Sequence, residues 1–235
     1  MNNNVNKLKC YCISDKIEIE KSLELRYNAF IGEKLKGDEK ENNSFSSNKL
    51  GDDIDDKAYH FGVYDNDELV AGARYAINKK SDIAAFRFFP EYSYDFFSNV
   101  ICKRPSICVG EPDWVVVKKE YRFSPASIIL LFNIIDHMME NYQVDIIVAM
   151  IEEGNLIDFY RKFGFSIISD SKREIDGYGN GNLTTSYIGY LSIDERFLQN
   201  SSSILLQGLL EYDKDYYEEK IKKFRRKIVQ KVSYD

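Results

Sequence analysis

Hydrophobic positions recur along the chain with two spacings, one typical of helices and the other of strands. The helical spacing predicts helices over residues 15–35, 124–141 and 156–163, and a helical stretch over 92–100. Strands are predicted at 10–14, 58–64, 68–77, 84–89, 114–117, 144–150, 165–168 and 184–192. Two further amphipathic helices are predicted within residues 195–235. The chain therefore mixes both types of element.

Several polar residues, prolines and glycines mark where these elements begin and end. Asp15 stands where a helix needs an N-cap, and Pro125 stands in a first turn, where its missing N–H costs little. Gly164 is placed to end the helix over 156–163. Asp65-Asn66-Asp67 predicts the turn of a hairpin. Residues 37–56 have almost no apolar content, which predicts a long, mobile surface loop.

The order of elements from Val115 onward is strand, helix, strand, helix, strand, strand. Apolar strands separated by helices indicate a sheet covered on both faces. We therefore expect an α/β (α+β) fold with a mixed, mainly antiparallel central sheet. One domain is expected over residues 10–194, followed by a helical extension over 195–235.

Composition and charge argue against several classes of function. The chain has 235 residues, 44% of them hydrophobic, and a net charge of −6, which argues against nucleic-acid binding through phosphate contacts. The sequence contains no run of 18 apolar residues, so no transmembrane span is expected. Its first ten residues contain no apolar stretch typical of a secretion signal, which favours a cytoplasmic location. The four cysteines lack the spacing of a zinc site, so we expect reduced thiols and no metal.

Two polar residues, Tyr160 and Glu111, stand beside predicted elements in positions that allow more than one interpretation. Tyr160 lies in the middle of a predicted helix, which on its own could simply be an amphipathic helix with a glycine end. Glu111 precedes a predicted buried strand, where a carboxylate could accept the proton of an attacking amine or could be an ordinary surface residue near a turn.

The segment Phe159-Tyr160-Arg-Lys-Phe-Gly164-Phe165 resembles the F-Y-x-x-x-G-F signature of the GNAT superfamily of N-acyltransferases. Residues 111–122 are similar to that family's fourth strand and the start of its pantetheine-binding loop. The resemblance implies that Tyr160 protonates the leaving thiolate and that Glu111 is the base or orients a water. It also implies that the main chain of Val115 and Val117 contacts the thioester. Arg122 and Asn155 are the remaining residues implied for donor binding.

The amino-terminal half resembles autoinducer synthases and long-chain N-acyl amino acid synthases within that superfamily. The matching features are Arg26-x-x-x-Phe30, an acidic cluster and Gly-x-Arg ending at Arg74, together with the strand end at 148–152. The resemblance implies an acceptor pocket formed by Arg26, Phe30, Asp52, Asp55, Arg74 and Trp114. Trp114 stands where lactone-forming relatives have an arginine, which favours an aromatic or apolar amino acid as acceptor over a cationic one.

The donor loop departs from the pattern of acetyl-CoA-dependent relatives. Pro125 and Ser127 occupy the positions of glycines whose main-chain amides bind pyrophosphate, and Pro125 has no N–H. This favours an acyl carrier protein, with its acyl-phosphopantetheine arm, as donor over acyl-CoA. No tightly bound cofactor is expected.

Simpler interpretations remain for several of these groups. The acidic cluster could be a solvated loop, His60 an ordinary strand residue, and the aromatic residues over 86–97 a core or the wall of an acyl tunnel. The basic residues between Lys220 and Lys231 could be a solvated face, a landing patch for an acidic carrier protein, or a contact with an anionic membrane surface.

The sequence predicts an enzyme that transfers a fatty acyl group from a carrier thioester to the amine of an amino acid or related small molecule. The alternatives are an acetyl-CoA-dependent N-acetyltransferase and a non-catalytic module that binds acyl groups or carrier proteins.

Overall fold

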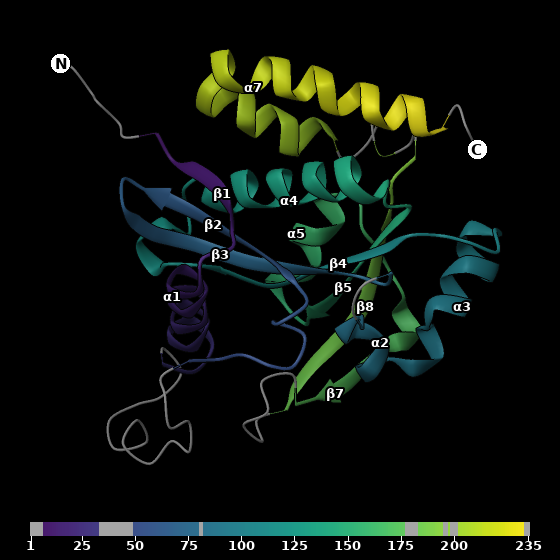
Figure 1. The fold of residues 1–235 in the computed structure, drawn as a ribbon. Helices are drawn as coiled ribbons and strands as arrows, with labels where there is room; N and C mark the ends of the chain where they lie inside the picture. The colour runs from purple at the N-terminus through teal and green to yellow at the C-terminus, as the bar shows by residue number, and fades with distance from the viewer. Residues whose placement is uncertain are drawn as a thin grey trace. The chain divides into compact units, whose positions relative to one another are not determined.

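The computed structural model describes residues 7–32, 49–79, 82–176, 183–194, 197 and 202–232 (Figure 1). The chain divides into two compact units. The first comprises Met1–Tyr75 and Trp114–Ile134, and the second comprises Ala76–Asp113 and Ile135–Asp235. Strands β3 (Glu68–Ile77) and β4 (Val109–Val117) run through both. The predicted division into 10–194 and 195–235 stays a prediction.

The first unit begins with strand β1 and helix α1. Asp15 caps α1, since its carboxylate accepts hydrogen bonds from the N–H groups of Ile17 (2.9 Å) and Glu18 (3.2 Å). A π-helical turn over Asn28–Gly32 follows the helix directly. The bounds are Lys9–Ile13 for β1, Lys16–Tyr27 for α1 and Tyr59–Asp65 for β2. The predicted strand, helix start and cap are confirmed, and residues 33–48 lie outside the described part.

The hairpin of β2 and β3 is also confirmed. Asp65 pairs with Glu68, which leaves Asn66 and Asp67 as a two-residue turn. Asn66 has φ of 53°, a left-handed conformation that asparagine tolerates better than most residues. Hydrogen-bonded neighbours in this unit follow the order β1-β2-β3-β4, with β1–β2 and β2–β3 antiparallel.

The carboxyl-terminal end of the predicted loop over 37–56 packs against the rest of the first unit. Leu50 and Ile54 are each 3% exposed, and the Leu50 N–H donates to the main-chain oxygen of Leu23 in α1 (3.1 Å). The two apolar side chains are isolated in a polar sequence, so periodicity gave no sign of their burial. They attach residues 49–58 to the first unit.

The second unit contains the remaining strands in the order β4-β5-β8-β6, with β7 paired to β8. Strand β5 is parallel to β4 and antiparallel to β8, and β6 and β7 are both antiparallel to β8. The bounds are Ile146–Glu152 for β5, Ser166–Ile167 for β6, Arg173–Ile175 for β7 and Thr184–Ser192 for β8. The predicted mixed, mainly antiparallel sheet is confirmed, and β7 was not predicted.

The prediction of a strand at 84–89 is wrong, because Ala84–Phe88 forms the short helix α2. A contact with a residue distant in the sequence explains why a helix forms here. The buried carboxylate of Glu111 accepts hydrogen bonds from the N–H groups of Ala84 and Ala85, which stabilises the start of a helix. Downstream lie a 3-10 turn at Pro90–Tyr92, helix α3 at Tyr94–Phe96 and a π-helical turn at Phe97–Cys102.

Helices α4 (Ala126–Tyr142), α5 (Asn155–Lys162) and α7 (Ser202–Val232) complete the fold. Helix α7 consists of two helical segments joined by a kink at Asp213, which matches the two helices predicted for this region. Salt bridges from Lys227 to Asp136 (2.6 Å) and from Lys231 to Asp145 (2.7 Å) fasten α7 to the second unit. None of the described helices is long and apolar enough to cross a bilayer.

Candidate functional site

Helix α5 presents Tyr160 two residues before the helix ends. The N–H of Phe165 donates to the main-chain oxygen of Tyr160 (3.0 Å), and Gly164 has φ of 91°. This conformation favours glycine, so the predicted role of Gly164 as the end of the helix is confirmed. The chain can then turn at once into β6.

The hydroxyl group of Tyr160 is held in its protonated form. The side chain is half-buried, and its ring contacts that of Phe165 edge to face (centroids 5.0 Å apart). Burial, and then the negative charge of Asp113, raise the pKa of Tyr160 to about 12. Tyr160 is therefore a hydrogen-bond donor throughout the physiological pH range. Asp113 lies on β4, so this interaction links α5 with β4 within the second unit.

Glu111 is 1% exposed and both of its carboxylate oxygens are bound by main-chain donors. Oε2 accepts from the N–H of Ala84 (2.5 Å), and Oε1 accepts from the N–H of Ala85 (2.9 Å). The carboxylate thus fixes the start of α2 against β4. The predicted role of Glu111 as a base stays a prediction, and the geometry assigns this residue a structural task as well.

Replacement of Glu111 by glutamine should lower stability and activity together. The amide keeps one acceptor oxygen, but its NH₂ group would face a main-chain N–H, which leaves a buried donor unsatisfied and costs about 2 kcal/mol. Thermal unfolding should show a fall in Tm of several degrees. The exposed Glu120→Gln is the matched control and should unfold like the wild type. Loss of activity at an unchanged Tm would instead show that the carboxylate acts only in the chemistry.

The main chain of strand β4 is irregular at Trp114. Its φ of 53° lies in the left-handed region, which is strained for a bulky side chain and typical of a local bulge. Among the described residues, β4 and β5 pair only at Val109–Ile146 and Gly110–Ile147, although both strands continue further. Beyond Gly110 the main chain of β4 therefore has no ladder partner in β5. Val115 and Val117 follow the bulge and are half-buried.

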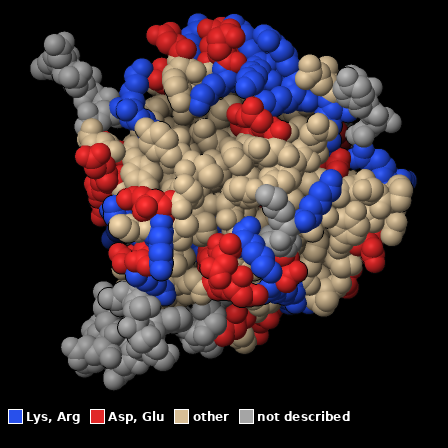
Figure 2. Space-filling view, in the orientation of Figure 1, with Lys and Arg blue, Asp and Glu red and all other residues tan. Residues whose placement is uncertain are grey.

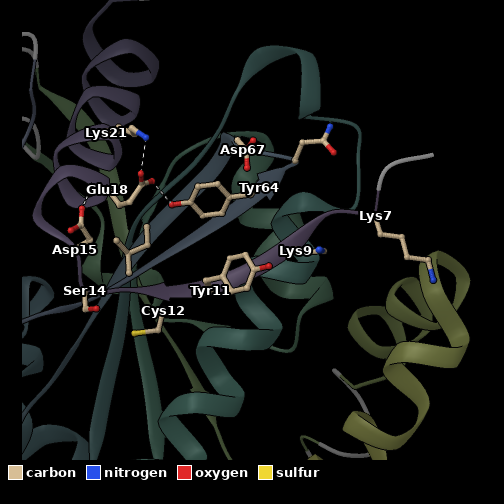
Figure 3. Close-up of a pocket in the computed structure, with 12 residues that line it drawn as sticks. Lys7, Lys9, Tyr11, Cys12, Ser14, Asp15, Glu18, Lys21, Tyr64 and Asp67 are labelled. Carbon is tan, nitrogen blue, oxygen red and sulfur yellow. Dashed lines mark hydrogen bonds and ion pairs between the residues drawn. The ribbon is translucent and has the colours of Figure 1, made fainter. Parts of the chain in front are cut away.

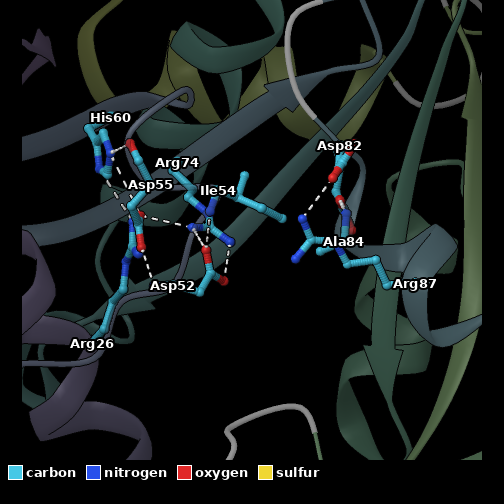
Figure 4. Close-up of polar contacts among 10 residues, drawn as sticks. Arg26, Asp52, Ile54, Asp55, His60, Arg74, Asp82, Ala84 and Arg87 are labelled. Atoms are coloured by element: carbon cyan, nitrogen blue, oxygen red, sulfur yellow. Dashed lines mark hydrogen bonds and ion pairs between the residues drawn. The ribbon is translucent and has the colours of Figure 1, made fainter.

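A buried polar cluster in the first unit joins the segment 49–58 to α1, β2 and β3 (Figure 4). The Arg26 guanidinium, with no exposed surface, donates to Oδ1 of Asp55 (2.7 Å) and to Nδ1 of His60 (3.4 Å). His60 Nε2 in turn donates to the main-chain oxygen of Asp55 (3.0 Å), so the ring is the neutral Nε2–H tautomer. Burial, and the charges of the two neighbouring arginines, lower the pKa of His60.

Arg74 completes the cluster from β3. Its guanidinium binds Asp52 through both terminal nitrogens (2.5 and 2.7 Å) and Asp55 through Nη1 (2.9 Å). Burial by itself disfavours the charged form of Asp52, but the bidentate contact with Arg74 outweighs it and lowers the pKa of Asp52. Two guanidinium groups and two carboxylates thus neutralise one another, as planar bidentate pairing allows.

Aromatic rings lie against this cluster. The indole of Trp114 lies 5.8 Å from the Arg26 guanidinium carbon and meets the ring of Phe30 edge to face, with centroids 5.4 Å apart. The structure therefore brings together all six residues predicted for the acceptor pocket. The cluster also contains His60, for which the sequence analysis gave an ordinary strand position as the simpler interpretation. Only the pairing of His60 with Arg74 across β2 and β3 could have indicated that it belongs to the cluster.

The donor loop between β4 and α4 is held by its own hydrogen bonds. Ser124 Oγ accepts from the N–H of Ala126 (3.2 Å), and Pro125 offers no N–H. Arg122 Nε donates to the main-chain oxygen of Val117 (3.4 Å) and the residue is exposed. At the start of α4 one main-chain donor that a phosphate would use is therefore absent, at Pro125, and another, the N–H of Ala126, is already bound by Ser124. Asn155 is the first residue of α5.

The basic residues of α7 are largely engaged by acidic neighbours. Lys223 and Lys227 contact Glu140 (3.4 Å each), and Lys222 contacts Glu219 (2.9 Å). Arg225 and Arg226 are exposed. Lysine and arginine residues gather over α7 on the face shown in Figure 2. Both the carrier-protein and the membrane-surface hypotheses for Lys220–Lys231 stay predictions.

A separate surface pocket of ≈ 860 Å³ lies beside β1 (Figure 3). Its lining includes Tyr11, Glu18 and Tyr64 but none of the residues predicted for the site. Glu18 accepts hydrogen bonds from Tyr64 (2.7 Å) and Lys21 (2.6 Å), so its carboxylate is already occupied. Burial and the Glu18 carboxylate both raise the pKa of Tyr64.

Comparison with solved structures finds N-acyltransferases. FeeM, an N-acyl amino acid synthase from uncultured soil microbes, aligns with a TM-score of 0.55 at 13% identity, over 83% of this chain and 95% of FeeM. NAA60 of Arabidopsis thaliana, solved in complex with acetyl-CoA, aligns with a TM-score of 0.52 at 13% identity, over 80% of this chain and 99% of NAA60. The chain has the GNAT fold. No family model and no curated protein matches its sequence.

Because a fold does not fix a function, the site residues decide what this GNAT fold can do. Its first unit holds the buried polar cluster, Trp114, the valines of β4 and Arg122. Its second unit holds Glu111, Tyr160 and Asn155. Asp113, whose charge helps to raise the pKa of Tyr160, was not among the residues predicted for the site. No sequence signal showed that its charge acts on Tyr160 across two elements.

Proposed function

We propose that this protein is an N-acyltransferase that moves a fatty acyl group from a thioester to the amine of an amino acid or related small amine. The observation that carries the proposal is the half-buried Tyr160 near the end of α5, where the chain turns into β6, in an N-acyltransferase fold. Burial and Asp113 of β4 raise the pKa of its hydroxyl, which keeps it a hydrogen-bond donor. The signature residues around Tyr160 also support it.

In the proposed reaction the neutral amine attacks the thioester carbonyl carbon, and a C–N bond forms. Main-chain amides of β4 near Val115 and Val117 would bind the oxygen as it becomes negative, a contact worth about 2.7–4 kcal/mol per donor. The C–S bond then breaks and the thiolate leaves. Tyr160 would donate a hydrogen bond to that sulfur, and the amine proton would pass to Glu111 or to a water it orients.

The raised pKa of Tyr160 determines how this residue would act on the leaving thiolate. A free thiol has a pKa of about 8.5, so full proton transfer from a tyrosine with a pKa of about 12 is uphill. Tyr160 would therefore stabilise the thiolate mainly as a hydrogen-bond donor. The proton lost by the amine would restore the tyrosine if transfer does occur.

The donor loop favours a carrier protein over coenzyme A as the source of the acyl group. Pro125 lacks an N–H and Ser124 already binds the N–H of Ala126, so few donors remain for the pyrophosphate of coenzyme A. A phosphopantetheine arm has one phosphate and needs fewer donors. The protein attached to the arm would supply the remaining binding energy.

The buried polar cluster favours an acceptor without a cationic side chain. Arg26 and Arg74 neutralise Asp52 and Asp55, and the indole of Trp114 already has the Arg26 guanidinium 5.8 Å away. A second cation would gain little there. An aromatic or apolar amino acid would instead use the rings of Trp114 and Phe30.

An acetyl-CoA-dependent N-acetyltransferase is the second candidate, favoured by the likeness to NAA60, which was solved with acetyl-CoA. One experiment compares the donors. Purified protein is incubated with a pool of amino acids and either a long-chain acyl carrier protein or acetyl-CoA, and the products are analysed by mass spectrometry. We expect an N-acyl amino acid from the carrier thioester. An N-acetyl product from acetyl-CoA alone would favour the second candidate, and no amide from either donor would favour a non-catalytic binding module.

A further inference from the structure

An unusual apolar side chain protrudes from the loop between β4 and α4. Among the described residues Phe123 is the most exposed large apolar side chain, at 105% of its reference area against 65% for the next, Ile17. Single exposed apolar residues are common, but complete exposure of a phenylalanine is costly. It lies in the loop that follows β4, after the 3-10 turn Lys119–Tyr121, and this loop begins where the segment proposed to receive the thioester ends.

The loop holds Phe123 outward through hydrogen bonds on both sides. Before it, the hydroxyl of Tyr121 donates to Asp65 (2.9 Å), and the N–H of Lys118 donates to the main-chain oxygen of Val70 (2.8 Å). After it, the N–H and the hydroxyl of Ser124 both donate to the main-chain oxygen of Tyr121 (2.9 and 2.7 Å). An aromatic ring on a preorganised loop is the kind of residue that dominates protein–protein binding energy.

Charged residues in the same loop as Phe123 indicate the sign of the charge that a partner would carry. Lys119 and Arg122 are both exposed within the same loop, and the Lys118 ammonium is paired with Glu68 (2.6 Å). The loop thus carries two exposed cations on the amino-terminal side of Phe123, with the exposed Glu120 as the opposing charge. In a chain of net charge −6 this combination fits an acidic surface carrying an apolar spot.

We propose that Phe123 is the anchor of a docking surface, formed with Lys119 and Arg122, for a small acidic carrier protein that delivers the acyl thioester. This inference rests on the proposed function. The basic face of α7 is the competing surface, but its lysines are largely engaged by Glu140, Glu219 and Asp145. A carrier docked at Phe123 would direct its phosphopantetheine arm along the neighbouring end of β4.

The test compares two donors that share the same acyl thioester. One is the acyl carrier protein and the other is acyl-pantetheine, which has the arm but no protein. We expect Phe123→Ala to raise KM for the acyl carrier protein about tenfold or more and to leave KM for acyl-pantetheine unchanged. Tyr216→Ala, which removes an exposed ring from α7, is the matched control and should change neither value. An unchanged KM for the carrier in Phe123→Ala, or an equal rise with both donors, would overturn the proposal.

Direct binding separates this inference from the proposed function. The affinity of the holo carrier protein, without an acyl group, is measured for the wild type and for Phe123→Ala. Tighter binding by the wild type would support the docking surface even if no turnover were found with any donor. Failure of the wild type to bind the holo carrier would overturn the surface, as would a Phe123-dependent gain in binding to anionic phospholipid vesicles without carrier binding.

Discussion

Replacement of Tyr160 by phenylalanine is expected to lower kcat for acyl transfer by about 10²–10⁴-fold. The substitution removes only the hydroxyl group, which is the proposed donor to the leaving thiolate. The ring contact with Phe165 remains, so the fold should be intact. Steady-state kinetics with the acyl thioester measures the loss, and thermal unfolding should give a Tm close to that of the wild type.

The pH dependence of the wild type provides an independent check. Because burial and Asp113 raise the pKa of Tyr160 to about 12, ionisation of this group should not reduce kcat between about pH 7 and pH 10. Tyr187→Phe is the control, since its hydroxyl binds Glu153 at the surface, and it should keep wild-type kinetics. If Tyr160→Phe turns over at the wild-type rate, Tyr160 has no part in the chemistry.

Replacement of Arg74 by leucine is expected to lower the free energy of unfolding by about 1.5–3 kcal/mol. Arg74 has no exposed surface and pairs with both Asp52 and Asp55, so its removal leaves Asp52 without its bidentate partner and leaves Asp55, whose side chain is 9% exposed, paired with Arg26 alone. Denaturant or thermal unfolding measures the effect, which should lower Tm by on the order of 10 °C. Arg74→Lys, which keeps the charge but not the bidentate contact, should be intermediate.

This loss of stability should depend on pH in a defined direction. The pKa of Asp52 is lower in the folded protein than its usual value of 3.8, so the unfolded chain binds protons first as the pH falls. The stabilisation from Asp52 is complete above that usual value and disappears as the pH drops through the folded pKa. The difference in free energy of unfolding between the wild type and Arg74→Leu should therefore be largest near neutral pH and should decrease in acid. Arg87→Leu, at an exposed ion pair with Asp82, should cost little at any pH. A small, pH-independent effect of Arg74→Leu would contradict the assigned role of the cluster.

Local signals in the sequence predicted most of the elements correctly. The Asp15 cap, the Asn66 turn and the Gly164 helix end each depend on one residue whose backbone or side chain favours a single local structure. Helix α2 is an element for which local sequence signals gave the wrong prediction. Residues 84–88 carry apolar and aromatic side chains that suit a strand, but the carboxylate of Glu111, distant in sequence, supplies the cap of a helix. The isolated Leu50 and Ile54 were missed for a related reason, because burial of single residues leaves no periodic pattern.

The sequence by itself determined the class of fold, which follows from the spacing of its hydrophobic residues. Its resemblance to known families also pointed to four members of the polar cluster and to Tyr160 as the candidate acid, because these residues stand in short motifs. Only the tertiary structure decided that Glu111 binds two main-chain donors, that His60 joins Arg26 and Asp55, and that Asp113 acts on Tyr160. These are interactions between residues far apart in the chain. Their chemistry depends on burial and distance, which no local pattern of residues encodes.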